Sequence, residues 1–194
     1  MKLQNLFFAA VIVLSANAAF AQDTNKDSHL VTITVPEVAL LDLESSNKSI
    51  DFILAGTAPK EAGLPMTFED ATAKNTSIWM NYSSIIGSKT EKERNVSVQI
   101  TEGDVPTGLK LTVLAGACKS GAGAIGTSSA ILTLSGEPQN IITGVGSTYT
   151  EDGAGKGHNL TYQLDYIKDA ATDYAKLDFD ASNVLEITYT LSDI

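Results

Sequence analysis

The sequence is poor in the residues that carry most enzymatic and metal chemistry. It has two histidines, one cysteine and one tryptophan among its 194 residues. With only His29 and His158 available, histidine-based acid–base catalysis or metal binding has few ways to form. The lone Cys118 cannot make a disulfide within the chain. We expect a buried, unreactive thiol there, and a free thiol that pairs with another chain is the alternative.

Positive charge is also scarce. The chain has 13 lysines and arginines against 23 aspartates and glutamates, which gives a net charge of −10. An acidic surface of this kind repels nucleic acid and anionic lipid. No apolar run after residue 21 is long enough to span a membrane. The expected partners are therefore proteins, including further copies of the chain, or surface polysaccharides.

The first 21 residues have the three parts of a bacterial secretory leader. Lys2 makes the start positive, residues 6–14 form an apolar run, and residues 19–21 read Ala-Phe-Ala, an A-x-A cleavage site. The apolar run is too short to cross about 30 Å of hydrocarbon. We predict cleavage after Ala21 and export to the periplasm or the cell surface.

Beyond the leader, apolar and polar residues alternate repeatedly with a period of two. Val96, Val98 and Ile100 share one face of such a segment, for example. Successive side chains of a strand point to opposite faces, so the pattern predicts half-buried antiparallel strands. The expected strands cover residues 30–35, 38–43, 49–54, 77–82, 95–101, 109–114, 132–134, 140–143, 160–166 and 185–191. A short helical turn is expected between residues 166 and 174.

Strands at this spacing, separated by glycine and proline turns, predict an all-β fold. We expect a single immunoglobulin-like antiparallel β-sandwich of about nine or ten strands. The length of the chain suits one domain. We place that domain at residues 29–194, after a flexible polar arm at residues 22–28.

A glycine motif in the middle of the chain matches a nucleotide fingerprint only in form. Gly121, Gly123 and Gly126 fit G-x-G-x-x-G, but that fingerprint requires a helix directly after it to hold the pyrophosphate. Residues 127–134 are β-branched and alternating, which favours a strand. We predict a glycine-rich loop between two antiparallel strands, and no cofactor.

A second motif concerns calcium. Asp178, Asp180 and Ser182 supply oxygens at the first, third and fifth positions of a calcium loop. Asn183 then stands where the loop needs glycine, and Tyr189 where it needs glutamate. These three residues are weak calcium candidates, and a solvated turn is the alternative.

The loop at residues 151–158 combines glycines with titratable groups. Asp152, His158 and Ser147 could be imagined as a triad, but neither their spacing nor a nucleophile-elbow G-x-S-x-G supports it. We expect a flexible hairpin tip, no catalytic residues and no enzyme.

Two expectations concern aromatic side chains. Trp79 lies in a predicted strand and could stack on a sugar, but we expect it to pack between the two sheets. Tyr162 and Tyr189 share their strand faces with leucine or isoleucine, so we expect both to be buried.

The end of the chain resembles that of the bacterial WxL-type surface domain. Residues 185–193 read LEITYTLSD, in which Tyr189-Thr190-Leu191 stands where the family has W-x-L. An earlier W-x-L has its nearest counterpart in Trp79-Met80-Asn81. Residues 96–114, which end in GLKLTVL, also look like the middle of pilin-like sandwiches such as the spore-coat-protein-U group. The resemblance implies a secreted cell-surface β-sandwich with binding or assembly duties.

These observations favour a structural or adhesive surface protein without catalysis. Residues 29–35 could add as a strand to a sheet edge of a neighbouring molecule, although an ordinary first strand in the chain's own sheet is the simpler interpretation. A carbohydrate-binding module that uses Trp79, with calcium at Asp178 and Asp180, is the alternative. A hydrolase that uses carboxylates alone is the weakest possibility.

Overall fold

The computed structural model describes residues 26, 28–45, 49–54, 56–68, 72–167, 174–177 and 183–194. The chain divides into two units, residues 1–35 and residues 36–194, and every strand in these described ranges belongs to the second. The predicted leader and most of the predicted arm lie outside the described residues, as do Asp178, Asp180 and Ser182.

The regular secondary structure of the second unit is almost entirely strand. They are β1 (Val38–Glu44), β2 (Thr72–Ile85), β3 (Arg94–Glu102), β4 (Leu109–Ala115), β5 (Ala122–Gly123), β6 (Thr127–Ser128), β7 (Leu132–Thr133), β8 (Gln139–Val145), β9 (Thr148–Tyr149), β10 (His158–Tyr166) and β11 (Glu186–Asp193). One 3-10 turn, η1 (Tyr174–Lys176), is found in the described residues. Within the part of the chain that the structure describes, no helix has the length and apolar character needed to cross a membrane.

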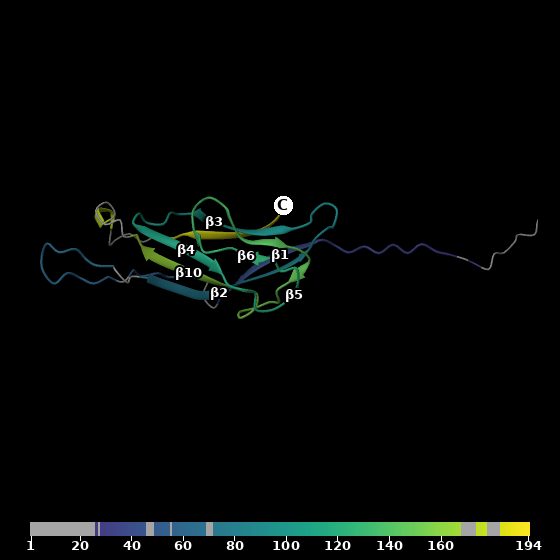
Figure 1. The fold of residues 1–194 in the computed structure, drawn as a ribbon, viewed down its shortest axis with the longest axis horizontal. Coiled ribbons are helices and arrows are strands. Elements are labelled where there is room, and N and C mark those ends of the chain that lie inside the picture. Colours follow the sequence, from purple (N-terminus) through teal and green to yellow (C-terminus); the bar gives the residue numbers. More distant parts are fainter. Residues whose placement is uncertain are drawn as a thin grey trace, which may run out of the picture. The chain divides into compact units, whose positions relative to one another are not determined.

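Two antiparallel sheets form a sandwich. The larger sheet has the order β5-β9-β2-β10-β4-β7, with β1 added to one end of β2, and the smaller has the order β11-β3-β8-β6. Figure 1 shows β2, β10 and β4 side by side in one layer and β3 in the other. The predicted all-β sandwich is confirmed. The described residues hold eleven strands because β5, β6 and β9, of two residues each, carry too little sequence for an alternation to be seen.

The core lies between the sheets and follows from the alternation. In β3 every second residue is buried, and the same holds for β10. Val96 and Val98 of β3 are fully buried, as is Leu160 of β10, so the apolar faces of the two sheets meet. Burial of such side chains contributes about 1.5–3 kcal/mol each, which is the main stabilisation of a sandwich.

Two of the predicted strands are not strands. Residues 30–35 belong to neither sheet, and residues 49–54 have no strand assignment. In residues 49–54 the alternation still predicts correctly which side chains face the core, because Ile50 and Phe52 pack against it. Among the described residues, however, residues 49–54 form no backbone hydrogen bond. Alternation therefore identified which side chains of this segment are partly buried, but the segment does not pair with another strand.

The glycine motif is also placed differently from the prediction. Instead of closing a hairpin, it leads from β4 of the larger sheet through β5 to β6 of the smaller sheet. Residues 127–134 form two short strands, β6 and β7, in different sheets. A Cβ added at Gly121 would lie 2.0 Å from the carbonyl oxygen of Tyr149, and one at Gly123 would lie 2.3 Å from that of Ser147. The glycines thus allow two backbones to approach closely.

Candidate strand-pairing site

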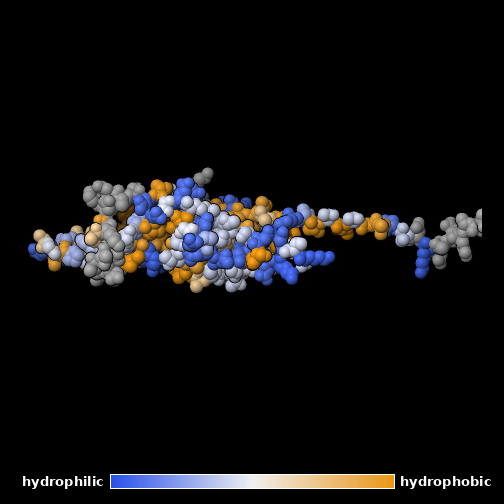
Figure 2. Space-filling view, turned by 90° about the horizontal axis from the view of Figure 1, so that it is seen from above, coloured by the Kyte–Doolittle hydropathy of each residue, from blue (hydrophilic) through white to orange (hydrophobic). Residues whose placement is uncertain are grey.

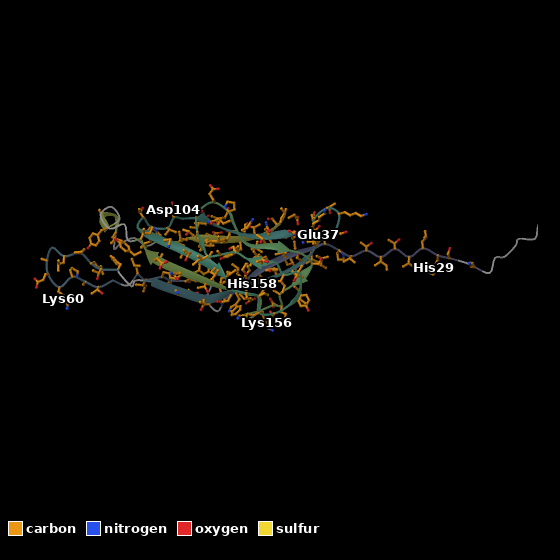
Figure 3. The ribbon with its side chains drawn as sticks, viewed as in Figure 1. His29, Glu37, Lys60, Asp104, Lys156 and His158 are labelled. Carbon is orange, nitrogen blue, oxygen red and sulfur yellow. The ribbon has the colours of Figure 1, made fainter. Side chains whose placement is uncertain are left out.

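Residues 29–35, which we call the assembly segment, combine a strand-like sequence with exposed apolar side chains. Leu30 is 100% exposed and Ile33 is 84% exposed, and Val31 and Val35 are also largely exposed. In Figure 3 the side chains of this segment project to either side of an extended trace. Figure 2 shows hydrophobic residues along it in orange. Its backbone takes part in neither sheet.

The segment's composition does not match its exposure. Val31, Ile33 and Val35 alternate with threonines, which is the pattern of a strand with one buried face. Each such side chain gains about 1.5–3 kcal/mol when it leaves water. Because its apolar face stays in water in the single chain, this segment is suited to pair with a surface supplied by another molecule.

The smaller sheet offers an edge for such pairing. Strand β11 pairs with β3 along one edge, and no described strand pairs with its other edge. Its length of eight residues is close to the seven residues of the assembly segment. Ile187 and Leu191 of β11 pack against the core, while Thr190 is exposed. An edge strand of this length with free N–H and C=O groups is a template for another strand.

A buried arginine holds one end of this edge in place. Arg94 is the first residue of β3, and its side chain is 1% exposed. Its Nε donates to Asp193 at the end of β11 (2.6 Å), and its Nη1 donates to the carbonyl oxygen of Val38 at the start of β1 (2.6 Å). The guanidinium therefore ties β1, the edge of the larger sheet, to β11, the edge of the smaller one.

Further partners surround the same guanidinium. Nη1 also donates to Ser84 Oγ (3.1 Å) and to the carbonyl oxygen of Ile85 (3.3 Å), and Nη2 is paired with Glu37 and with Glu91 (3.5 Å). Three carboxylates thus face one positive charge. The negative charges of Asp193 and Glu37 raise the pKa of Glu91, against the opposing effect of Arg94. The network fixes the point at which the chain enters β1.

The second titratable cluster lies around His158, whose position inside the sandwich is labelled in Figure 3. His158 is 2% exposed; its Nδ1 lies 2.8 Å from the carbonyl oxygen of Gly116, and its Nε2 lies 3.0 Å from Tyr82 Oη. Tyr82 Oη also donates to the carbonyl oxygen of Ile125 at 2.5 Å. A carbonyl oxygen only accepts, so Nδ1 carries the hydrogen and Nε2 of the neutral ring is an acceptor. The single hydroxyl hydrogen of Tyr82 therefore serves two acceptors.

Burial controls the charge of this cluster. It lowers the pKa of His158, and the hydrogen bond to Gly116 opposes this only in part. Burial likewise raises the pKa of Tyr82. A neutral, hydrogen-bonded histidine in a core fixes the chain segments around it, and here it holds the loop after β4 against β2.

The free cysteine differs from its prediction. Cys118 is half-buried rather than buried, and its thiol donates to the carbonyl oxygen of Ser120 (3.1 Å). Together with Ile125, Ser128 and His158 it lines an open depression of about 460 Å³. The sequence could not indicate this, because the depression is formed by the crossing from one sheet to the other.

Trp79 also differs from its prediction. In β2 the core side chains are Met80 and Tyr82, so Trp79 points to the outer face of the larger sheet, where it is half-buried. It is a cross-strand neighbour of Glu44 in β1. Trp79 therefore does not pack between the sheets. By contrast, Tyr162 and Tyr189 are buried, at 3% and 9% exposed, as predicted.

The imagined triad is not assembled by the described contacts. Ser147 Oγ accepts from the N–H of Ile86 (3.2 Å), while His158 contacts Tyr82 and Gly116. No family model, curated protein or solved structure matches the chain.

Proposed function

We propose that the protein is an exported, non-enzymatic component of the bacterial cell surface with a structural or adhesive role, and that its copies join by strand addition. The observation that carries the proposal is the assembly segment, an alternating apolar strand sequence that is exposed in the single chain. The leader-like residues 1–21 support export.

In the proposed mechanism, the assembly segment of one copy pairs with the outer edge of β11 in the next. Main-chain hydrogen bonds would supply affinity, and the apolar side chains of alternate residues would supply specificity. Val31, Ile33 and Val35 would turn toward the core side of the sheet, the side on which Ile187 and Leu191 of β11 pack, and the intervening threonines toward water. Because the donor and the acceptor are different surfaces, each copy could accept one neighbour and donate to another, which builds an open chain.

The test is the assembly state of residues 22–194 over a concentration series, measured by sedimentation velocity. The native chain should form larger species as its concentration rises. Replacement of Val31, Ile33 and Val35 by aspartate should leave a monomer, because charge cannot be buried on that face. The matched control replaces Thr32 and Thr34 by aspartate on the opposite face and should still assemble. A native chain that stays monomeric throughout, or three chains that assemble equally, would show the proposal to be wrong.

A peptide with the sequence of residues 28–37 gives an independent measurement. It should bind the monomeric triple-aspartate variant and block assembly of the native chain. A peptide of the same composition in scrambled order should do neither.

One observation favours a second function, carbohydrate binding. Trp79 is half-buried on an outer sheet face, a position from which an aromatic ring can stack on a sugar. Binding to a glycan array that disappears in Trp79→Ala would support this function. Tyr149, which is 53% exposed in β9, is the matched aromatic control. Unchanged glycan binding in Trp79→Ala would exclude a role for this side chain.

A further inference from the structure

The boundary between the two units of the chain falls at a proline. The assembly segment ends at Val35, Pro36 follows, and β1 begins two residues later at Val38. Pro36 therefore separates an exposed, strand-like sequence from a strand of the larger sheet. A chain that reversed its direction here would place the assembly segment beside β1.

Strand β1 has an edge that could receive the segment. It pairs with β2 along one edge, and no described strand pairs with the other. Two antiparallel strands need a connection of only two residues, and a segment tethered so closely has a high effective concentration at its neighbour. Pairing within the chain should therefore compete strongly with pairing between copies. The assembly segment nonetheless belongs to neither sheet.

The shortest reversal is a two-residue turn at Pro36 and Glu37. Hairpin turns of this length are of types I′ and II′, and both need a positive φ at their first residue. The ring of Pro36 fixes φ near −65°, so neither type can form. Within the described ranges Glu151 is the one non-glycine residue with a positive φ, so Glu37 does not have a type I′ conformation either.

A three-residue turn would suit the side chains better. It would pair Ile33 with Ala39, so that Val31 would pair with Leu41 on the same face. Leu41 packs against the core, and this face of β1 is therefore the apolar one. The two-residue turn would instead place Ile33 beside Leu40, which is 67% exposed on the outer face. Only the longer turn would bury the apolar side of the assembly segment.

Pro36 blocks the three-residue turn as well. That turn is a type I turn followed by a residue in the left-handed conformation, and here it would cover residues 35–37. Val35 would need the right-handed helical conformation, which a following proline disfavours. Glu37 would need the left-handed conformation, which is uncommon for a residue of its kind. Glu37 is also held by its ion pair with Arg94.

We infer that Pro36 determines the partner of the assembly segment. It prevents the segment from pairing with β1 of its own chain and so leaves it for a second copy. Arg94 supports this role, because it holds Glu37 and the carbonyl oxygen of Val38 directly after the proline. The identity of the partner rests on the proposed function, whereas the block within the chain rests on turn geometry alone.

Two variants of residues 22–194 separate the proline from its neighbour. Pro36→Asn combined with Glu37→Gly introduces Asn-Gly, which can form the two-residue turn and also supplies glycine at the left-handed position of the three-residue turn. The matched control, Glu37→Gly alone, loses the same pair with Arg94 but keeps the proline. Circular dichroism checks that both variants are folded.

Amide hydrogen exchange of residues 30–35 gives the first readout, measured at a dilution at which each chain is monomeric. The native chain and the control should exchange as an unpaired peptide does. In the double variant, alternate amides of the segment should exchange at least about tenfold more slowly, because ladder hydrogen bonds protect them. Protection in the native monomer, or none in the double variant, would overturn the inference.

Assembly gives the second readout, measured by sedimentation velocity over a concentration series. The control should form larger species over the same concentrations as the native chain. The double variant should need concentrations about tenfold higher or more, because its segment must first leave β1. Equal assembly of the double variant and the control would contradict the inference.

The two readouts also separate this inference from the proposed function. A native chain might never assemble, while its segment is unprotected and becomes protected in the double variant. That result would refute assembly by strand addition and still establish that Pro36 blocks pairing within the chain.

Discussion

The hydroxyl oxygens of Tyr162 and Tyr189 lie 2.7 Å apart in the core and join the two sheets by a hydrogen bond. Tyr162 belongs to β10 of the larger sheet and Tyr189 to β11 of the smaller. Burial raises the pKa of Tyr162 to about 12. The pKa of Tyr189 is also raised, mainly by burial and to a smaller extent by the nearby Tyr162. This bond fixes the inner face of β11, whose other edge pairs with no strand in the described part of the chain.

Removal of either hydroxyl should therefore cost more than removal of both. Tyr162→Phe or Tyr189→Phe leaves the other hydroxyl buried without its partner, which costs about 1–3 kcal/mol of unfolding free energy. The double replacement buries no unpaired hydroxyl and should recover part of that loss. Urea denaturation of the four chains measures the coupling directly. If the two single losses simply add in the double variant, the hydroxyls do not depend on each other.

Arg94 should be the most sensitive charged residue of the sandwich. Arg94→Met removes the donor from the carbonyl oxygens of Val38 and Ile85 and leaves Asp193 without its partner. Because Asp193 and Glu37 are 46% and 57% exposed, water can solvate them after the change, and the loss comes mainly from the carbonyl oxygens left without a donor, at about 1–3 kcal/mol. The midpoint of urea denaturation should fall accordingly.

A surface ion pair provides the control for Arg94. Lys156 pairs with Glu151, but both side chains are nearly half exposed, at 46% and 43%. Lys156→Met should change the unfolding free energy by less than about 1 kcal/mol. Equal losses from the two replacements would mean that the buried network contributes no more than a solvated pair.

The alternation of apolar and polar residues predicted the buried side chains more accurately than it predicted which segments pair as strands. Val96, Val98 and Tyr162 follow the expected faces because their strands have one side on the core and one toward water. Ile50 and Phe52 also pack on the core, yet their segment forms no ladder. The period of two shows only that alternate side chains face the core. Backbone hydrogen bonding also requires a partner strand, and a local sequence pattern does not show whether one is present.

The meeting of Asp42, Glu44 and Asp152 could not be predicted for a related reason. Asn81 is polar and lies on the outer face of β2, so its burial is produced by a loop some seventy residues further along the chain. The same loop brings Asp152 to Asp42 and Glu44. Trp79 was assigned to the wrong face because a single large aromatic in a strand suits either face. Only the cross-strand register decides such positions.

The glycine motif yields a prediction about backbone approach. Gly121 has φ +90°, and a Cβ there would lie 2.0 Å from the carbonyl oxygen of Tyr149. Gly155 has a similar φ of +85° but no atom within 4 Å of an added Cβ. Gly155→Ala should cost only the left-handed strain of about 1–2 kcal/mol. Gly121→Ala adds a backbone clash and should lose at least about 2 kcal/mol more. Thermal or urea unfolding compares the two, and equal losses would show that the strand crossing adjusts freely.

The buried His158 should make stability depend on pH. Its pKa is lowered in the folded state, so below the ordinary value of about 6.5 the unfolded chain takes up a proton that the folded chain resists. Because the unfolded state then binds more protons, the free energy of unfolding falls as pH falls through that window, and it is unaffected by this group at higher pH.

His158→Gln should lower stability at neutral pH through its lost contacts with Tyr82 and Gly116, but should flatten this pH dependence. His29→Gln removes the only other histidine and should leave the dependence unchanged. Urea midpoints for the three chains between about pH 7.5 and pH 5.5, on either side of the ordinary histidine pKa, measure the effect, and equal slopes in all three would assign the pH dependence to groups other than His158.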